Sequence, residues 1–247
     1  MRNFLPNRAL QLPFTAAEFG VWYLEKKIRI GRTYALLALG LCSCAGEFPS
    51  DPTKILAAAA AYDEQILLDS LNLIEAWHTS NNTGVPAILR PGLSRSSLPS
   101  AISGDKCRLT EELKTLWSWR DGGIGSVPFI WYHDFLPLND AVAEYKALVQ
   151  NPLVRWDPSY MPVFSFEGEW YAAYCGEGSA VSGPIIHYFV EDEARITAVN
   201  LTMFIATMAD AFQSGAIRWH DGGMAEDIQK VKEIHQQRNG GYAFPYY

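Results

Sequence analysis

The sequence predicts an α+β domain. Several segments carry apolar residues at helical spacing, one aromatic segment has the pattern of a β-hairpin, and further short apolar segments bounded by turn residues are typical of strands. With 247 residues, 49% of them hydrophobic, the chain is long enough to bury a large core. Stability therefore requires neither a metal nor a disulfide, and we expect no cofactor.

A first helix is predicted from Lys54 to His78, because no Gly or Pro interrupts this stretch and Asp51 can cap it. A second helix is expected after Thr110, a good N-cap residue, and the Asp121-Gly122-Gly123 sequence is expected to end it. The residues expected to face inward from these two helices are Leu67, Leu71, Ile74, Trp77, Leu113, Leu116 and Trp117.

Strands and further helices follow. Three segments outside the aromatic hairpin are expected to be extended: residues 126–132, 134–138 and 183–190. Three more helices are expected: one capped by Asn139 or Asp140, one over residues 200–213, and a polar one over about 225–238. Gly215 is expected to supply the left-handed exit of the helix at 200–213.

The aromatic segment VFSFEGEWYAAY, residues 163–174, is predicted to be a hairpin that turns at Glu167-Gly168. Both of its faces are apolar. One face would carry Phe164, Phe166 and Tyr171, and the other would carry Val163, Trp170, Ala172 and Tyr174. This pattern favours a central strand pair covered on both sides, although one face could instead be exposed for binding.

The charge is unevenly distributed along the chain. The net charge is −7, but residues 1–44 hold six Lys or Arg against two Glu, which gives +4, and the rest holds 14 basic and 25 acidic residues, which gives −11. An acidic body repels phosphates, which disfavours nucleic acid and favours a basic protein partner. Alternatively, the acidity only keeps the domain soluble.

Residues 1–44 resemble a bacterial lipoprotein signal. A basic stretch from Lys26 to Arg32 precedes an uncharged apolar run from Tyr34 to Leu41, and Leu41-Cys42-Ser43-Cys44 resembles a lipobox in which Cys44 carries the lipid. The apolar run is too short to span a bilayer as a helix. We therefore expect a lipoprotein anchored to the membrane of the cell envelope; the alternative is a cytoplasmic protein with an N-terminal helix.

The expected organisation is a leader at residues 1–44, a tether at 45–53, a globular domain at 54–220, and a C-terminal helix and tail at 221–247. Beyond the leader, the only cysteines are Cys107 and Cys175. They either pair in an oxidising compartment or remain two free buried thiols, and the sequence leaves this choice open.

Catalytic motifs are absent from the sequence. It contains no G-x-S-x-G elbow, no H-E-x-x-H motif and no phosphate-binding G-x-x-x-x-G-K-[ST] loop. His133 and His220 each precede an Asp, but neighbouring residues on a strand point to opposite faces, which suits a ligand pair poorly. We therefore predict no catalytic residue and no metal site, with a hydrolase centred on His133 or His220 as the least favoured alternative.

The candidate protein-binding residues are aromatic and acidic. The aromatic and acidic residues of the hairpin are candidates, and so is the charge run that follows the strand at 183–190. The full set is Trp170, Tyr171, Tyr174, Glu167, Glu169, Glu191, Asp192 and Glu193.

The order of seven segments between about Leu71 and Gly215 resembles the SUKH superfamily of cell-wall-assembly regulators and toxin-immunity domains. The segments are LIEAWHTSNN, ILRPGLS, LTEELKTLWSWRDGG, FLPLNDAVAEY, YMPVFSFEGEWYAAY, PIIHYF and the expected helix from Leu201 to Phe212. The resemblance implies a mainly antiparallel sheet of about five or six strands with helices packed around it. It also implies a non-enzymatic protein-binding domain, which in many members neutralises a cognate toxin. The alternative is an envelope scaffold or regulatory subunit.

Overall fold

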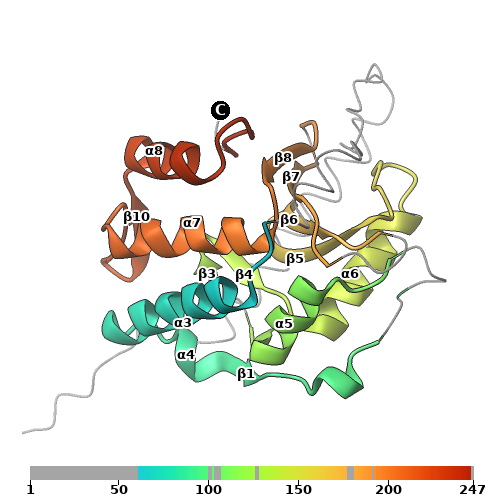
Figure 1. Ribbon diagram of the computed structural model, residues 1–247, viewed down its shortest axis with the longest axis horizontal. Helices are drawn as coiled ribbons and strands as arrows, with labels where there is room; N and C mark the ends of the chain where they lie inside the picture. Colours follow the sequence, from blue (N-terminus) through green and yellow to red (C-terminus); the bar gives the residue numbers. More distant parts are fainter. Residues whose placement is uncertain are drawn as a thin grey trace, which may run out of the picture. The chain divides into compact units, whose positions relative to one another are not determined.

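The computed structural model describes residues 61–99, 102, 107–125, 128–176, 181–190 and 192–245 (Figure 1). It confirms the α+β class: helices surround a mainly antiparallel six-stranded sheet, and two small two-stranded sheets accompany it. The leader with Cys44, the tether, the Asp51 cap and Glu191 lie outside the described residues. Within the described part, no helix is both long and apolar enough to cross a membrane.

The six strands of the main sheet follow one another in sequence order, and every neighbouring pair is antiparallel. Their bounds are β3 Pro128–Ile130, β4 His133–Phe135, β5 Tyr160–Phe166, β6 Glu169–Tyr174, β7 Ile185–Phe189 and β8 Arg195–Ala198. Since the chain reverses at each step, the β3–β4, β5–β6 and β7–β8 turns lie at one end of the sheet, which we name the turn end. The β4–β5 and β6–β7 connections lie at the other end, named the loop end.

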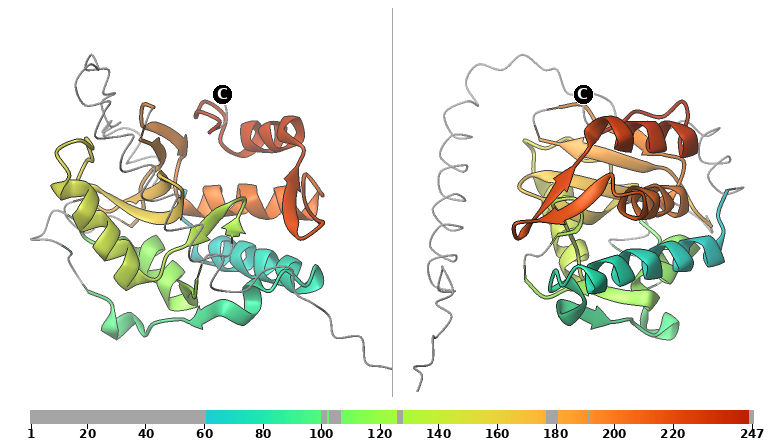
Figure 2. Two further views of the ribbon diagram at one scale, coloured as in Figure 1. Left: turned by 180° about the vertical axis from the view of Figure 1, so that it is seen from behind. Right: turned by 90° about the vertical axis from the view of Figure 1, so that its left-hand side faces the viewer.

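Helices α3 and α7 lie side by side against the sheet (Figures 1 and 2). The helices are α3 Glu64–Ser80, α4 Val85–Ile88, α5 Glu111–Trp119, α6 Leu138–Gln150, α7 Leu201–Gln213 and α8 Ile228–Arg238, with a 3₁₀ turn at Arg95–Ser97. The small sheets pair β1 Leu89–Pro91 with β2 Arg120–Gly123, and β9 Ile217–His220 with β10 Gly223–Glu226.

The predicted helices are confirmed, with corrections at their starts. Thr110 caps α5 and Gly215 follows α7 with a φ of 71°, as expected. Asn200, placed within the predicted helix, is the N-cap of α7. Within the described residues the first helix begins at Glu64, because the Asp63 backbone is extended and its side chain accepts a hydrogen bond from the Ile66 N–H at 3.0 Å. The predicted start at Lys54 lies outside the described residues.

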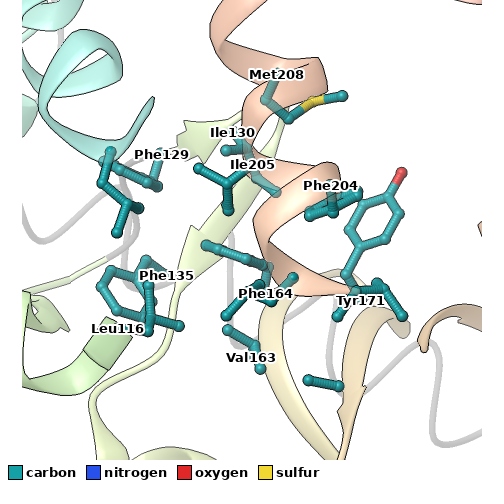
Figure 3. Close-up of a cluster of buried hydrophobic side chains, with 14 of the residues drawn as sticks. Leu116, Phe129, Ile130, Phe135, Val163, Phe164, Tyr171, Phe204, Ile205 and Met208 are labelled. Carbon is teal, nitrogen blue, oxygen red and sulfur yellow. The ribbon is translucent and has the colours of Figure 1, made fainter. Parts of the chain in front are cut away.

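Side chains fill both faces of the aromatic hairpin. A main core lies between one face of the sheet and helices α3, α5 and α7 (Figure 3). A second core lies on the other face, where Trp170 and Tyr188 pack with Trp156 and with Leu148 of α6. The prediction of a strand pair covered on both sides is therefore confirmed. The predicted position of Val163 is wrong: a β-bulge between Pro162 and Phe164 turns it into the main core.

The start of α6 is capped from a distance. Neither Asn139 nor Asp140 caps it, contrary to the prediction, because the helix already begins at Leu138. The buried Asp121 carboxylate accepts a hydrogen bond from the Leu138 N–H at 2.8 Å and also pairs with Arg90 at 3.0 Å. A Cβ on Gly122, at a φ of 68°, would lie 2.2 Å from the Pro137 nitrogen. The Asp121-Gly122 pair therefore docks β2 onto the start of α6.

The substitution Asp121→Ala is expected to lower the free energy of unfolding by about 1–2 kcal/mol, because it leaves the first N–H groups of α6 without their cap. Arg90→Ala, which removes only the half-exposed partner, is expected to cost less than about 1 kcal/mol. Urea unfolding of both variants measures the difference. Equal losses would show that the ion pair, and not the cap, is what Asp121 contributes.

A buried carboxylate joins α5 to α7. Glu112 is 1% exposed, and its Oε1 accepts hydrogen bonds from the Thr202 N–H at 2.9 Å and the Thr202 hydroxyl at 2.7 Å. Its Oε2 accepts from the Leu201 N–H at 3.3 Å. Burial raises the pKa of Glu112 to about 7, against the opposing hydrogen bonds from Thr202, Leu201 and Gly183.

Cys107 and Cys175 form a disulfide, which settles the alternative that the sequence left open. Both residues are fully buried, and the bond ties the segment before α5 to the end of β6 at the loop end. Its two residues are 68 positions apart in the chain.

The C-terminal part packs on the same body. The predicted domain boundary at residue 220 falls within the β9–β10 hairpin, and Val231 of α8 belongs to the main core. Beyond α8, the Ala243 N–H donates a hydrogen bond to the Ile196 carbonyl at 3.0 Å, which places the tail along β8, the last strand of the main sheet.

Candidate functional site

The turn end of the main sheet gathers three turns that lie far apart in sequence. The β5–β6 turn has positive φ at Glu167 (43°) and Gly168 (91°), the geometry of a type I′ hairpin. The predicted pairs across it, Phe166 with Glu169 and Phe164 with Tyr171, are confirmed. The β7–β8 turn lies beside it, because the Val190 N–H donates to the Gly168 carbonyl at 3.3 Å.

The predicted acidic candidates come together here. Glu167, Asp192 and Glu193 are all exposed on these two adjacent turns. Asp192 is partly neutralised by Arg195 at 3.0 Å. The third turn adds Tyr132, whose side chain is 39% exposed. We name the surface formed by Tyr132, Glu167, Asp192 and Glu193 the acidic turn surface.

A cluster of two imidazoles and one carboxylate lies behind this surface. His187 Nε2 lies 2.5 Å from Glu169 Oε1, and His133 Nε2 lies 3.4 Å from the same oxygen, which is long for a hydrogen bond. The three side chains come from β4, β6 and β7. His133 is buried, while the Glu169 and His187 side chains remain 20% and 12% exposed. The cluster thus lies at the edge of the main core.

The protonation states of the cluster follow from its surroundings. Burial lowers the pKa of His133, against the opposing effect of Glu169, so this imidazole is neutral at pH 7. Burial alone would raise the pKa of Glu169, but the interactions with His133 and His187 outweigh it and lower the pKa to about 2. Glu169 is therefore ionised, and an Nε2–H of each histidine can point toward it. For the neutral His133, that tautomer leaves Nδ1 as the basic nitrogen.

A strained aromatic residue supports the cluster. Trp131, in the β3–β4 turn, is buried and has a φ of 46°, which is unusual for a bulky residue. Its ring stacks on Tyr171 at 6.3 Å between centroids, and Tyr171 in turn lies 4.6 Å from the His133 ring. Burial raises the pKa of Glu226 in β10, and a hydrogen bond from Trp131 opposes that shift. Packing from β6 and β10 thus holds the turn in a costly conformation.

The aromatic candidates are engaged within the fold. Trp170 lies in the second core and Tyr171 in the main core. The Tyr174 ring lies across Gly176 and Gly183, where an added Cβ would come within 2.0 Å and 2.5 Å of its atoms. These contacts explain why the β6–β7 loop is rich in glycine. Glu169 belongs to the histidine cluster, so the exposed candidates within the described residues are Glu167, Asp192 and Glu193.

Sequence reasoning missed the cluster because its members lie 36 and 18 positions from one another along the chain. The predicted hairpin placed Glu169 opposite Phe166, but no signal in the sequence gave the register of β7 that brings in His187. His220, the other histidine considered for catalysis, lies 3.1 Å from Asp221 on an exposed turn. Within the described ranges, no group of three or more His, Cys, Asp or Glu residues could hold a metal ion.

Comparisons with known proteins leave the chain without an assigned family. The sequence matches no protein-family model and no curated protein.

Proposed function

We propose that this chain is a non-enzymatic, SUKH-type domain that binds a basic protein and acts as an immunity protein that neutralises a cognate toxin. The observation that carries the proposal is the acidic turn surface. It places three exposed carboxylates and an exposed tyrosine on adjacent turns of a sheet that is packed on both faces. Partners with positive charge would be steered to it, and tyrosine is enriched at the energetic centres of protein interfaces.

The packing of the hairpin supports a rigid platform. Most of its aromatic side chains are enclosed by the two cores, so the backbone of the turns is held by buried neighbours rather than by a ligand. A preorganised surface loses little conformational entropy when a partner docks. The resemblance to the SUKH superfamily supports the same function, and an envelope scaffold or regulatory subunit would use the same surface.

The Cys107–Cys175 disulfide supports an envelope location. Structural disulfides persist in oxidising compartments and are rare in reducing ones. A lipoprotein anchored through Cys44 would present the domain in such a compartment, so the toxin it binds would act on the wall or the membrane. A cytoplasmic location remains the alternative that the N-terminal pattern allows.

Charge reversal of the acidic turn surface tests the binding proposal. The triple variant Glu167→Lys, Asp192→Lys and Glu193→Lys is expected to bind a basic protein partner, recovered by pull-down with the full-length chain, at least tenfold more weakly, mainly through slower association. The control variant carries Asp69→Lys, Asp140→Lys and Glu233→Lys, which make the same charge change at exposed positions on α3, α6 and α8. Its affinity is expected to change less than threefold in a surface plasmon resonance titration.

Two outcomes would contradict this proposal. Equal weakening by both triple variants would show that net charge, and not the acidic turn surface, attracts the partner. Hydrolytic turnover that His187→Gln abolishes would instead support a second candidate function. The observation that favours this second function is the convergence of His133, Glu169 and His187, in which Glu169 could orient an imidazole base.

A further inference from the structure

The loop end of the sheet carries a surface of the opposite character. The last turn of α6 and the segment after it, residues 146–155, contain no acidic residue in a chain whose net charge is −7. Leu153 is 74% exposed and Val149 is 37% exposed, so this short stretch holds two of the exposed large apolar side chains of the described structure. Lys146 and Arg155 flank them and are also exposed. We name Lys146, Val149, Leu153 and Arg155 the cationic patch.

The backbone under the patch is firmly held. The Tyr145 hydroxyl donates to the Pro158 carbonyl at 2.8 Å, and the Trp156 indole donates to the Tyr160 carbonyl at 2.9 Å. The Leu153 N–H donates to Asn151 Oδ1 at 3.0 Å. These bonds, together with the buried ring of Trp156, hold the turn in place while Leu153 points outward. The fixed turn holds the Leu153 side chain in water, so a partner that covers this side chain forms a more stable complex.

The charges of the patch are available to a partner. Neither Lys146 nor Arg155 forms an ion pair or hydrogen bond with any residue of the described ranges. The carboxylates that flank the patch along the chain are Glu144 and Asp157. Both are half-buried, and Asp157 accepts a hydrogen bond from the Ser159 N–H at 2.8 Å. The patch therefore combines an exposed apolar centre with two unpaired cations, which is the chemistry that an anionic lipid surface recognises.

We propose that the cationic patch rests on an anionic lipid bilayer, with Leu153 entering the headgroup region and Lys146 and Arg155 contacting acidic headgroups. This proposal rests on the envelope location proposed above. Val181, 39% exposed in the β6–β7 connection, lies at the same loop end. Two cations and a few apolar side chains bind weakly alone, but a tether to the same membrane raises their effective concentration to the millimolar range.

The patch and the acidic turn surface lie at opposite ends of β5. Residues 151–158 lead into Tyr160, the first residue of this strand, and Glu167 follows its last residue, Phe166. Seven residues of strand separate the two ends by about 20 Å. A domain that rests on its cationic patch would therefore hold the acidic turn surface away from the bilayer, where repulsion by acidic headgroups is screened.

A fluorescent probe at position 153 tests the contact in the full-length chain. Cys42→Ser and Cys44→Ser leave the disulfide as the only other cysteines, so a bimane label on Leu153→Cys reports on that site alone. Because Cys44→Ser removes the anchor, vesicles of phosphatidylglycerol and phosphatidylcholine that carry a lipid-attached quencher are supplied at roughly millimolar lipid, which replaces the effective concentration that the tether provides. Under these conditions we expect strong quenching at position 153. The control label on Ile124→Cys, at a residue 67% exposed elsewhere on the domain, should stay unquenched.

Charge variants test the headgroup contact. Lys146→Glu with Arg155→Glu should reduce quenching at position 153 and weaken vesicle binding at least twentyfold, about fivefold for each cation removed. The matched control, Arg218→Glu with Lys232→Glu, makes the same change at two cations that also lack ion pairs in the described ranges. It should change binding less than threefold.

Several results would overturn the inference: equal quenching at positions 153 and 124, quenching at neither, the same quenching on pure phosphatidylcholine, or concentration-dependent self-association that the Leu153→Asp variant abolishes. None of them would affect binding of a basic protein at the acidic turn surface, because that binding is measured without lipid. Fractionation of cells that express Cys44→Ser tests the envelope location separately.

Discussion

Loss of the Cys107–Cys175 disulfide is expected to lower the free energy of unfolding by about 4 kcal/mol. The bond closes a loop of 68 positions, and chain-entropy reasoning assigns roughly this value to a loop of that length. Both cysteines are fully buried, so their replacement removes no surface contact. The expected loss comes mainly from the greater conformational freedom of the unfolded chain without the bond. Urea unfolding of the double variant Cys107→Ala and Cys175→Ala, compared with the unmodified chain, measures it.

Dithiothreitol provides the control for this experiment. It should lower the unfolding midpoint of the unmodified chain once the disulfide is reduced, and it should leave the double variant unchanged, because that variant has no disulfide in its described residues. If the unmodified chain had the same urea midpoint with and without reductant, the bond would contribute nothing to stability.

Glu112 is expected to contribute more stability in mildly acidic solution than at neutral pH. Its folded-state pKa is raised to about 7 from an ordinary value of 4.5. A carboxyl group with a raised pKa contributes stability that is complete below its ordinary pKa and is lost as the pH rises through the folded pKa. The free energy of unfolding should therefore fall between pH 4.5 and 7, by up to about 3 kcal/mol from this group.

The variant Glu112→Gln should remove most of that slope, since the amide does not titrate. It keeps an oxygen that can accept from Thr202, and it loses the acceptor for Leu201, so its stability at pH 4.5 should be somewhat lower. Glu111→Gln, at the exposed neighbouring position, is the matched control and should keep the slope. An unchanged slope in Glu112→Gln would contradict the assignment of this pH dependence to the buried carboxylate.

Glu169 acts in a separate pH window. Its pKa is lowered to about 2, so its contribution is complete above its ordinary pKa and is lost as the pH falls toward 2. The pH dependences of the two carboxyl groups therefore have opposite signs and lie in different pH ranges. Burial lowers the pKa of His78, His133 and His235, so these groups contribute stability at neutral pH that is lost as the pH falls below their ordinary pKa of 6.5. The contribution of Glu112 is therefore measured as the difference between the unmodified chain and Glu112→Gln at each pH.

Local patterns predicted much of the fold. The helix α7 and its Gly215 exit were both predicted from the sequence, because each depends on residues close together in the chain. The hairpin register was predictable for the same reason, since a Glu-Gly turn of two residues determines which partners face each other.

Long-range devices escaped prediction. The cap of α6 comes from Asp121, seventeen positions before Leu138, and no local pattern distinguishes it from the predicted caps Asn139 and Asp140.

The shortest strands were also missed. Strands β1, β2, β8, β9 and β10 are only three or four residues long, too short for an alternation of apolar and polar residues to be recognised.

The candidate site was predicted only in part. The acidic residues of the two turns were identified as a surface, but their proximity depends on the pairing of Val190 with Gly168 across β6 and β7. The exposed aromatic residue was not predicted, because the sequence of a strand with two apolar faces does not indicate which ring remains exposed. Tyr132, which is exposed, lies outside the predicted hairpin of residues 163–174.

The tail bond from Ala243 to Ile196 bears on solubility. The outer edge of a terminal strand carries unpaired amide and carbonyl groups, which can recruit a strand from another molecule and begin a fibre. Here residues of the same chain occupy part of that edge of β8, and the Phe244 ring rests 5.4 Å from His235. The segment after α8 thus blocks part of the β8 edge from pairing with a strand of another copy.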